Sequence, residues 1–297
     1  MITGPAGEVR VHCPAKVNLY LRIVGRRADG YHDLVTVMQP LTLADILTVT
    51  LAGEGISLTC DRPELPGGED NLVWRAAKRF QGETGLAPGV RLHLEKRIPV
   101  AAGLGGGSSD AAGTLRALND LTGAPLDAAG LHRLAGGLGA DVPFFLGRTP
   151  AVGRGTGTRL SPLTLRPYWY LLINPGVPLS TRWVYENLDL ANLPGPGGAE
   201  TWDPDHPELW VRNDLGTVAL RQIPALGDLL KALTALGAWT QGMSGSGPTL
   251  FGLFPTREAA WQAGLTLRRT FPGWLAVAQG LTGQEPESSW ENHLWTI

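Results

Sequence analysis

Cysteine is scarce in this sequence. Its 297 residues include two cysteines, Cys13 and Cys60. Residues so far apart indicate neither the paired spacing of a metal site nor a disulfide framework, so each is predicted to be a small buried apolar residue. A chain without a disulfide framework is typical of a reducing compartment, and a cytoplasmic location is expected.

Charge and long apolar runs are also sparse. Charged residues make up 18% of the chain, the net charge is -2, and no run of like charges occurs. This balance does not favour a nucleic-acid surface. No apolar run approaches the ~20 residues of a membrane span. The first seven residues lack the basic and apolar parts of a signal peptide. The expected partner is therefore a small molecule, not a nucleic acid or a membrane.

Glycine and apolar residues are abundant. The chain has 40 glycines, and 43% of its residues are hydrophobic, which argues for a sizeable core and against disorder. The length suits one large domain or two ordinary ones. Nine of the ten tryptophans lie from Trp169 onward, and most are predicted to be core or interface residues.

The glycines are concentrated between Pro99 and Ala112, in the run PVAAGLGGGSSDAA. Ahead of it, apolar and polar residues alternate over residues 90–95, which predicts a strand. Behind it, apolar residues at helical spacing predict a helix that ends at Thr122-Gly123. The expected N-cap of this helix is one of three residues, Ser108, Ser109 or Asp110.

A glycine loop that opens a helix is suited to bind phosphate, because glycine allows close approach and the helix start offers unpaired N–H groups. The loop does not fit the Walker pattern, since Gly107 is followed by Ser108 and Ser109 and not by lysine. Counting from Gly103, a serine occupies the last glycine position of the dinucleotide and protein-kinase loops. An ordinary turn between a strand and a helix is the alternative interpretation.

The first part of the chain predicts a β-ribbon. Apolar and polar residues alternate over residues 9–13 and 17–23, which predicts two strands, and Pro14-Ala15 is expected to interrupt them. Lys16 and Asn18 then fall on the face opposite Val17, where a lysine is usually solvated.

A hairpin turn is predicted over residues 26–32 from the Asp29-Gly30 pair. Two separate strands are predicted next, over residues 34–37 and 46–51. A loop over residues 61–70 and a helix over residues 72–80 follow them.

Asp141 lies at a predicted change of chain direction. A helix over residues 126–138 is expected to stop at Gly139. Val142 precedes Pro143, which favours extended backbone at Val142. A turn or cap aspartate is the plain interpretation of Asp141.

The second half predicts a β-α-β-β-α-β order, typical of a ferredoxin-like sandwich. Residues 153–167 are predicted to connect two domains, residues 193–207 to form an exposed loop, and the chain from Thr282 onward to be loosely held unless Trp290 and Trp295 dock it. The predicted strands cover residues 168–173, 239–243, 249–254 and 274–278. The predicted helices cover residues 180–188, 213–223, 226–236 and 257–270.

Three stretches in this order resemble the motifs of the GHMP kinases, small-molecule kinases without a Walker loop. They are Pro14-Ala15-Lys16-Val17-Asn18, the Gly103–Ser109 loop and Ser244-Gly245-Ser246-Gly247-Pro248. The likeness extends over residues 8–280 and includes Arg27–His32 and Gly139–Phe145. It implies a two-domain α+β fold, with an N-terminal mixed domain over residues 1–163 and a ferredoxin-like domain over residues 164–297.

By this resemblance, the enzyme would transfer the γ-phosphoryl group of ATP. Asp141 matches the catalytic aspartate of the family and would accept the proton of the attacking hydroxyl. Lys16 matches the catalytic lysine, whose charge would stabilise the transferred group. Eleven consecutive residues match the ATP-phosphate loop: Pro99, Val100, Ala101, Ala102, Gly103, Leu104, Gly105, Gly106, Gly107, Ser108 and Ser109.

One branch of the family matches best, and it acts on a cytidine-diphosphate-linked methylerythritol in the non-mevalonate isoprenoid pathway. The resemblance assigns Tyr31 and His32 to the cytosine, by stacking and hydrogen bonding. Tyr185 is expected to supply a second ring, with Trp183 as its rival. Two further predicted substrate contacts are Asn18 and Thr181.

The sequence departs from the family pattern at Ala101-Ala102, where relatives often carry glycine. No carboxylate is evident as a ligand for the expected Mg²⁺, which suits an ion held mainly by phosphates and water. The oligomeric state implied is a monomer or a weak homodimer.

Two alternatives stay open. A different GHMP kinase would act on mevalonate, homoserine or a sugar, which would not require the Tyr31-His32 turn. A non-catalytic nucleotide- or RNA-binding module would use the same layers, and the balanced charge and Asp141 oppose it.

Overall fold

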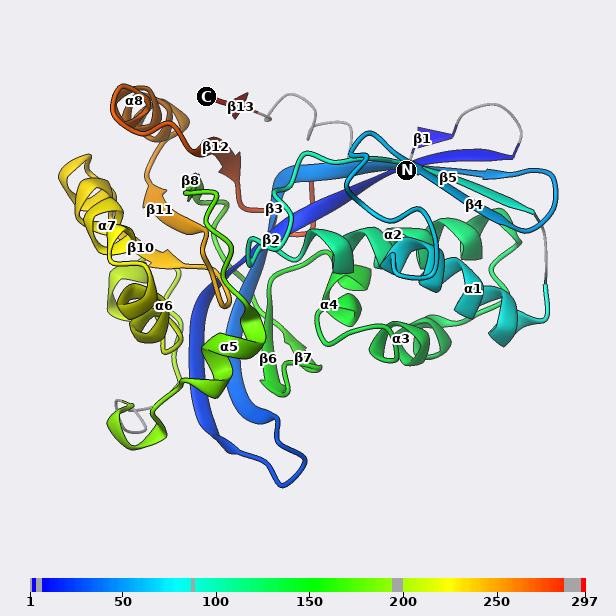
Figure 1. Ribbon diagram of the computed structural model, residues 1–297, viewed down its shortest axis with the longest axis horizontal. Coiled ribbons are helices and arrows are strands. Elements are labelled where there is room, and N and C mark those ends of the chain that lie inside the picture. Colours follow the sequence, from blue (N-terminus) through cyan, green and yellow to red (C-terminus); the bar gives the residue numbers. More distant parts are fainter. Residues whose placement is uncertain (1, 4–6, 87–88, 194–199, 286–294) are drawn as a thin grey trace. The chain divides into compact units, whose positions relative to one another are not determined.

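The computed structural model describes residues 2–3, 7–86, 89–193, 200–285 and 295–297 (Figure 1). The chain forms two compact units, each assembled from separate segments. The first comprises residues 1–15, 44–100 and 105–148, and the second comprises residues 16–43, 101–104 and 149–297. The glycine loop and the two longest strands therefore contribute residues to both units.

The described residues of the first unit form one part of a sheet and four helices. The sheet order is β1-β2-β3-β5-β4, in which β4 runs parallel to β5 and β3 antiparallel to it. These strands are β1 (Ile2–Thr3), β2 (Glu8–Arg26), β3 (His32–Leu51), β4 (Ile56–Cys60) and β5 (Val90–Glu95). The helices are α1 (Leu72–Thr84), α2 (Gly106–Leu121), α3 (Ala128–Gly136) and α4 (Val142–Gly147), which lie together on one side of these strands (Figure 1).

Local signals explain much of this unit. Asn71 caps α1 by accepting a hydrogen bond from the Val73 N–H at 3.0 Å. The apolar stripe of α1 is buried, as its spacing predicts: Val73, Ala76, Ala77 and Phe80.

The long strands differ from their prediction. β2 continues through Pro14-Ala15 without interruption, and the two strands predicted over residues 34–37 and 46–51 are parts of the single strand β3. Proline has a backbone angle compatible with extended chain, so it removes one donor without ending the strand. Every residue from Val11 to Leu19 is buried, so both faces of this part of β2 are covered.

The second unit contains the ferredoxin-like sandwich. Its sheet has the order β10-β11-β8-β12-β13, with every neighbour antiparallel. The strands are β8 (Trp169–Asn174), β10 (Thr240–Met243), β11 (Leu250–Phe254), β12 (Trp274–Gln279) and β13 (Trp295–Thr296), and the helices are α5 (Thr181–Glu186), α6 (Gly216–Gln222), α7 (Ala225–Ala235) and α8 (Arg257–Arg268). The predicted β-α-β-β-α-β order is confirmed.

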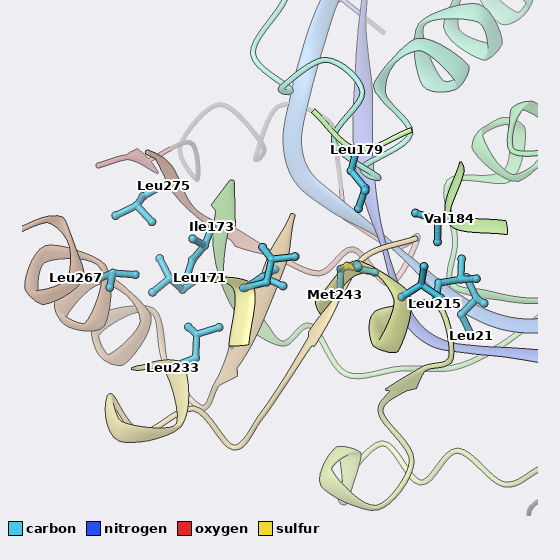
Figure 2. Packing of buried hydrophobic residues seen from close by; sticks show 14 of the residues in the cluster. Leu21, Leu171, Ile173, Leu179, Val184, Leu215, Leu233, Met243, Leu267 and Leu275 are labelled. Atoms are coloured by element: carbon cyan, nitrogen blue, oxygen red, sulfur yellow. The ribbon is translucent and has the colours of Figure 1, made fainter. Parts of the chain in front are cut away.

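The core of this unit joins the sheet to the β2–β3 ribbon. α7 and α8 both pack on the sheet. Buried apolar residues from the strands and helices form one cluster, which includes Leu21 of β2, Leu171 of β8, Met243 of β10 and Leu267 of α8 (Figure 2). This cluster fixes the end of β10 from which the Ser244–Pro248 loop departs.

Three short strands and two 3-10 turns are the other elements in the described part of the second unit: β6 (Ala151–Gly155), β7 (Arg159–Pro162), β9 (Arg212–Asn213), η1 (Leu190–Asn192) and η2 (Pro207–Leu209). β6 pairs with β3 and β7, so the predicted connector over residues 153–167 is partly a hairpin. That hairpin forms because β3 offers an edge with which residues 151–155 can pair.

Parts of the predicted exposed loop and of the predicted tail lie outside the described residues. These parts are residues 194–199 of the loop and residues 286–294 of the tail, and the second part includes Trp290. The described end of the tail is held, since β13 pairs with β12 and the Ile297 N–H donates to the Leu275 carbonyl at 3.2 Å. Within the described part of the chain, no helix has both the length and the apolar character that a membrane span requires.

Candidate active site

Lys16 and Asn18 form a buried polar pair on β2. Their exposed fraction is 4% each, so the usual interpretation of a strand lysine as solvated does not hold for Lys16. The Lys16 ammonium donates to Asn18 Oδ1, and Asn18 Nδ2 donates to Thr36 Oγ1 at 2.8 Å. The backbone N–H of Lys16 donates to the Leu104 carbonyl at 2.9 Å. A buried lysine requires such polar neighbours, because an unsolvated charge without them is costly.

The Ser244–Pro248 loop lies against this pair. The Asn18 N–H donates to Ser244 Oγ at 3.1 Å, and Ser244 Oγ donates to the Gly103 carbonyl at 2.9 Å. A Cβ built on Gly245 would lie 3.3 Å from Asn18 Oδ1 and 3.5 Å from Lys16 Nζ. The loop thus joins β2 to the middle of the glycine loop. Sequence reasoning noted the loop but named no site residue in it, although its similarity to a family motif was the available signal.

The predicted cytosine residues also lie in the second unit. His32 and Tyr185 stack with ring centroids 5.3 Å apart, and Thr181 Oγ1 hydrogen-bonds Ser246 Oγ at 2.7 Å. The latter contact links α5 to the loop beside Lys16. Tyr31 is 68% exposed at the hairpin tip. Burial, with Arg26 nearby, lowers the pKa of His32 below its usual value, which favours the neutral ring.

The stacking contact favours Tyr185 over Trp183 as the second ring. Both side chains are partly buried against the hydrophobic cluster. Only for Tyr185, however, does the described structure show a ring contact with a predicted cytosine residue.

The hairpin turn forms as predicted. β2 ends at Arg26 and β3 begins at His32, with the Arg27 N–H donating to the Tyr31 carbonyl at 2.8 Å. Gly30 adopts a φ of 87°, the left-handed conformation that the Asp29-Gly30 pair predicts. Asp29 Oδ1 accepts from the Tyr31 N–H at 3.1 Å, which fixes the backbone that carries the exposed ring.

Within the glycine loop, Ala101, Ala102, Gly103 and Leu104 belong to the second unit. Gly103 has a φ of 76°, and a Cβ there would lie 2.2 Å from the Ser244 carbonyl oxygen. Only glycine fits this close approach. Ala101 also adopts a left-handed φ, 52°, so its backbone is strained. The Ala102 carbonyl accepts from the Thr249 N–H at 3.4 Å.

The remaining loop residues belong to the first unit. Pro99 and Val100 precede the glycines, and Val100 is exposed. Gly105 is the N-cap of α2, so the three predicted N-caps lie inside the first turns of the helix. The left-handed φ of Gly105, 73°, turns the chain into the helix at Gly106, so the N-cap lies about three to five residues before the predicted ones. Ser108 and Ser109 follow Gly106 and Gly107, and Ser109 is buried.

The start of α2 suits an anion. Gly105 offers no side-chain cap, so the first helical N–H groups lack the acceptor that Ser or Asp would supply. These groups and the helix dipole together favour a phosphate.

A buried ion cluster that sequence reasoning missed supports this helix start. The Lys96 ammonium donates to Asp110 Oδ2 at 2.7 Å and to Asp45 Oδ2. Asp45 Oδ1 accepts from the backbone N–H groups of Arg97 and Ile98 at 2.6 and 2.8 Å. The available signal was a lone aspartate inside the apolar run Leu43–Leu47.

The charges of the cluster shift its pKa values. Burial acts to lower the pKa of Lys96, but the charges of Asp110 and Asp45 raise it above its usual value. Burial and the charge of Asp45 raise the pKa of Asp110, and Lys96 offsets only part of this. Two carboxylates thus share one ammonium beneath the glycine loop.

Asp141 immediately precedes α4 in the first unit and is half-buried. Its side chain makes no capping hydrogen bond to that helix. Val142 is the first helical residue, so the predicted extended backbone there is wrong. Pro143 at the second helical position is compatible with a helix start, because the N–H that it lacks has no helical partner there. Lys16 and Asp141 lie in different units, and their pairing stays a prediction.

No group of three or more His, Cys, Asp or Glu side chains able to hold a metal occurs among the residues that the structure describes. No ligand for Mg²⁺ is therefore assigned to this chain.

The chain matches two family models. The model of the GHMP kinases N terminal domain matches residues 71–148, and that of the GHMP kinases C terminal matches residues 208–273. These matches fall on either side of the predicted domain boundary at residues 163 and 164, which itself stays a prediction.

Curated relatives cover nearly the whole chain. The 4-diphosphocytidyl-2-C-methyl-D-erythritol kinase of Syntrophotalea carbinolica is 44% identical over 271 residues, or 89% of this chain and 96% of the relative. The enzyme of the same name from Geobacter metallireducens is 40% identical over 275 residues, or 91% of this chain and 98% of the relative.

Solved structures agree with these relatives. A crystal structure of 4-(cytidine 5'-diphospho)-2C-methyl-D-erythritol kinase superposes with a TM-score of 0.80 at 39% identity, covering 92% of this chain and all of that one. A homoserine kinase from Cytophaga hutchinsonii shares the fold, with a TM-score of 0.73 at 20% identity, covering 100% of this chain and 99% of that one. The chain therefore belongs to the GHMP kinases and, within them, to the family of the 4-diphosphocytidyl-2-C-methyl-D-erythritol kinases.

Proposed function

We propose that this enzyme transfers the γ-phosphoryl group of ATP to the 2-hydroxyl of 4-diphosphocytidyl-2-C-methyl-D-erythritol, in the non-mevalonate route to isoprenoids. The relatives at 40–44% identity support an ATP-dependent kinase of this pathway. The observation that carries the choice of substrate is the stacking of His32 on Tyr185, two residues that the family resemblance assigns to the cytosine.

The polar contacts of the second unit support a substrate path. From the Lys16–Asn18 pair the contacts continue through the Asn18 N–H to Ser244 Oγ, and two residues further along that loop Ser246 Oγ hydrogen-bonds Thr181 on α5. Tyr185 lies one helical turn after Thr181, and its ring meets His32. A molecule with a reacting hydroxyl at one end and a cytosine at the other would match this order of residues.

The proposed chemistry is positioning and charge stabilisation, as in other phosphoryl transfers. Asp141 accepts the proton of the attacking hydroxyl, and Lys16 stabilises negative charge on the transferred group. The loop from Pro99 to Ser109 holds the ATP phosphates, with N–H groups at the start of α2 as donors. Mg²⁺ is expected to neutralise phosphate charge, and none of these residue roles depends on its geometry.

We further propose that the enzyme is cytoplasmic, binds no nucleic acid, and is a monomer or a weak homodimer. The net charge of -2 and the absence of like-charge runs from the sequence support the second point.

The direct test is release of ADP from ATP and Mg²⁺ with three acceptors in parallel. The cytidyl substrate should give ADP together with a product phosphorylated at the 2-hydroxyl, located by phosphorus NMR. Mevalonate and homoserine should give ADP only at the acceptor-free background rate. Background ADP with the cytidyl substrate would refute the proposal. Equal or faster turnover of mevalonate or homoserine would favour the alternative GHMP kinase.

A further inference from the structure

Asn213 is attached to the strand that carries Lys16. β9 pairs in parallel with β2, and Asn213 lies opposite Leu21. The next residue, Asp214, strengthens this attachment: its N–H donates to the Leu21 carbonyl and its Oδ2 accepts from the Ile23 N–H, each at 2.9 Å. Asn213 therefore has a fixed place beside β2.

The side chain of Asn213 reaches from β9 to the Ser244–Pro248 loop. Its Nδ2 donates to the carbonyls of Met243 and Gly245, both at 2.7 Å. Its Oδ1 accepts from the Leu215 N–H at 2.9 Å. Both amide hydrogens are thus used on the two carbonyls that flank Ser244. A side chain with one donor could not hold both.

The residues so held are those that contact the Lys16–Asn18 pair. Ser244 Oγ bridges the Asn18 N–H and the Gly103 carbonyl. Gly245 has a φ of 57°, and its Cβ position lies within 3.5 Å of Lys16 Nζ. The backbone of Gly245 therefore lies beside the lysine ammonium, and its carbonyl accepts a hydrogen bond from Asn213.

We infer that Asn213 is a positioning residue of the phosphoryl transfer, which sets Ser244 and Gly245 so that Lys16 is correctly placed. The inference rests on the proposed function, in which Lys16 stabilises the transferred group. Asn213 itself has no chemical part in the reaction. Its contribution is to hold the backbone carbonyls of Met243 and Gly245. These two contacts fix Gly245 beside Lys16 and fix Ser244 where its hydroxyl bonds the Gly103 carbonyl of the glycine loop.

The isosteric variant Asn213→Asp tests this directly. A carboxylate keeps the shape but replaces two N–H donors with acceptors that face two carbonyl oxygens. Misplacement of a catalytic group by about 1 Å costs on the order of 100-fold, so kcat should fall about 10- to 100-fold. The KM values for ATP and the cytidyl substrate should change by less than about threefold, because substrate contacts remain.

Asp214→Asn, the reverse substitution at the next position, is the matched control. Asp214 is 3% exposed and binds the backbone of β2 and Arg212, not the loop. Asp214→Asn should lower the melting temperature while leaving kcat within about twofold. A similar loss of kcat in both variants would mean that loosening β9 is the cause, and the inference would be wrong. If Asn213→Asp does not fold, Asn213→Ala is measured against the same kcat criterion.

A coupling measurement separates positioning from general loosening. In a Lys16→Arg background, which keeps the charge on a different side chain, Asn213→Asp should cost less than about threefold in kcat. The full loss in that background would show that the two residues act independently and would overturn the inference. A native chain without kinase activity would instead refute the proposed function, whereas an active native chain with an unaffected Asn213→Asp variant refutes this inference alone.

Discussion

Lys16 owes its environment to a strand that is buried on both faces. Alternation along residues 16–19 predicts one apolar and one solvated face, yet the side chains on both faces are buried. A lysine in such a place is retained only with polar neighbours, and Asn18 provides one of them. The burial that makes Lys16 costly to the fold is also what strengthens its charge toward a phosphate, because fewer water molecules screen it.

Lys16→Ala and Asp141→Asn should each lower kcat by about two to four orders of magnitude, since one removes the stabilising charge and the other the proton acceptor. Both variants should stay folded by circular dichroism. Lys78→Ala, at an exposed position of α1, is the control and should retain full turnover. Normal kcat in either site variant would remove that residue from its proposed role.

Tyr31→Ala should weaken binding of the cytidyl substrate with little effect on stability. The side chain is 68% exposed, so the fold gains little from it. Stacking of a base on an aromatic ring is worth about 1–3 kcal/mol, which corresponds to a five- to 150-fold rise in Kd by calorimetry. Val24→Ala, another exposed apolar position on the hairpin, should leave Kd unchanged. An unchanged Kd for Tyr31→Ala would argue against a nucleobase at this turn.

At the scale of the element, the two glycines at the start of α2, Gly106 and Gly107, differ in the space that a side chain would find. A Cβ on Gly106 would lie 3.2 Å from Asp45 Oδ2, Lys96 Nζ and Ile98 Cγ2, so it would press on the buried ion cluster. A Cβ on Gly107 would meet only the end of the Leu72 side chain, at 3.7 Å. The first glycine is thus required by the fold, while the second is exposed and free to serve a ligand.

Gly106→Ala should therefore lower the free energy of unfolding by about 1–3 kcal/mol, as overpacking does. Gly107→Ala should leave stability unchanged or slightly higher, since alanine is the better helix former. Its KM for ATP should nevertheless rise, because the added methyl group occupies the surface proposed for the phosphates. Urea titration and ATP saturation curves measure the two effects. An unaltered KM in Gly107→Ala would place the phosphates elsewhere.

Elements set by local chemistry could be predicted from the sequence. The Asp29-Gly30 turn, the buried stripe of α1 and the β-α-β-β-α-β order follow from turn residues and periodicity, and the structure has all three. The start of α2 was misplaced because capping preferences favour Ser108, Ser109 and Asp110, whereas the left-handed Gly105 turns the chain earlier.

Features that depend on distant chain could not be predicted. The ion cluster joins Asp45, Lys96 and Asp110 from three elements, and no local pattern relates them. The joining of two predicted strands into β3 likewise depends on pairing with β5 and β6. Ser244 belongs to the site because it contacts Asn18 and Gly103, which only the folded chain brings together.

At the scale of the whole molecule, the ion cluster of Asp45, Lys96 and Asp110 makes the free energy of unfolding depend on pH. The direction of this dependence is opposite to that of an ordinary salt-bridged carboxylate. Two carboxylates and one ammonium leave a surplus negative charge in a buried place, and burial with Asp45 holds the pKa of Asp110 well above its usual value. In the unfolded chain the same carboxyl titrates near ~3.9. Between that value and the raised folded pKa, the folded chain binds more protons than the unfolded chain. The contribution of Asp110 to the free energy of unfolding therefore falls as pH rises through this window.

Asp110→Asn should remove that contribution, because an amide keeps the oxygen that accepts from Lys96 but binds no titrating proton. Relative to the native chain, the variant should gain stability as pH rises above about 4. Urea unfolding at several pH values measures the difference, with Asp120→Asn at an exposed position of the same helix as the control. Parallel pH profiles for native chain and variant would show that Asp110 is ionised in the folded state. Lys96 would then balance only one of two buried charges. Lys96→Met removes the ammonium from both carboxylates and leaves Asp45 only its backbone N–H donors, so it should cost about 3–5 kcal/mol whether or not Asp110 is ionised.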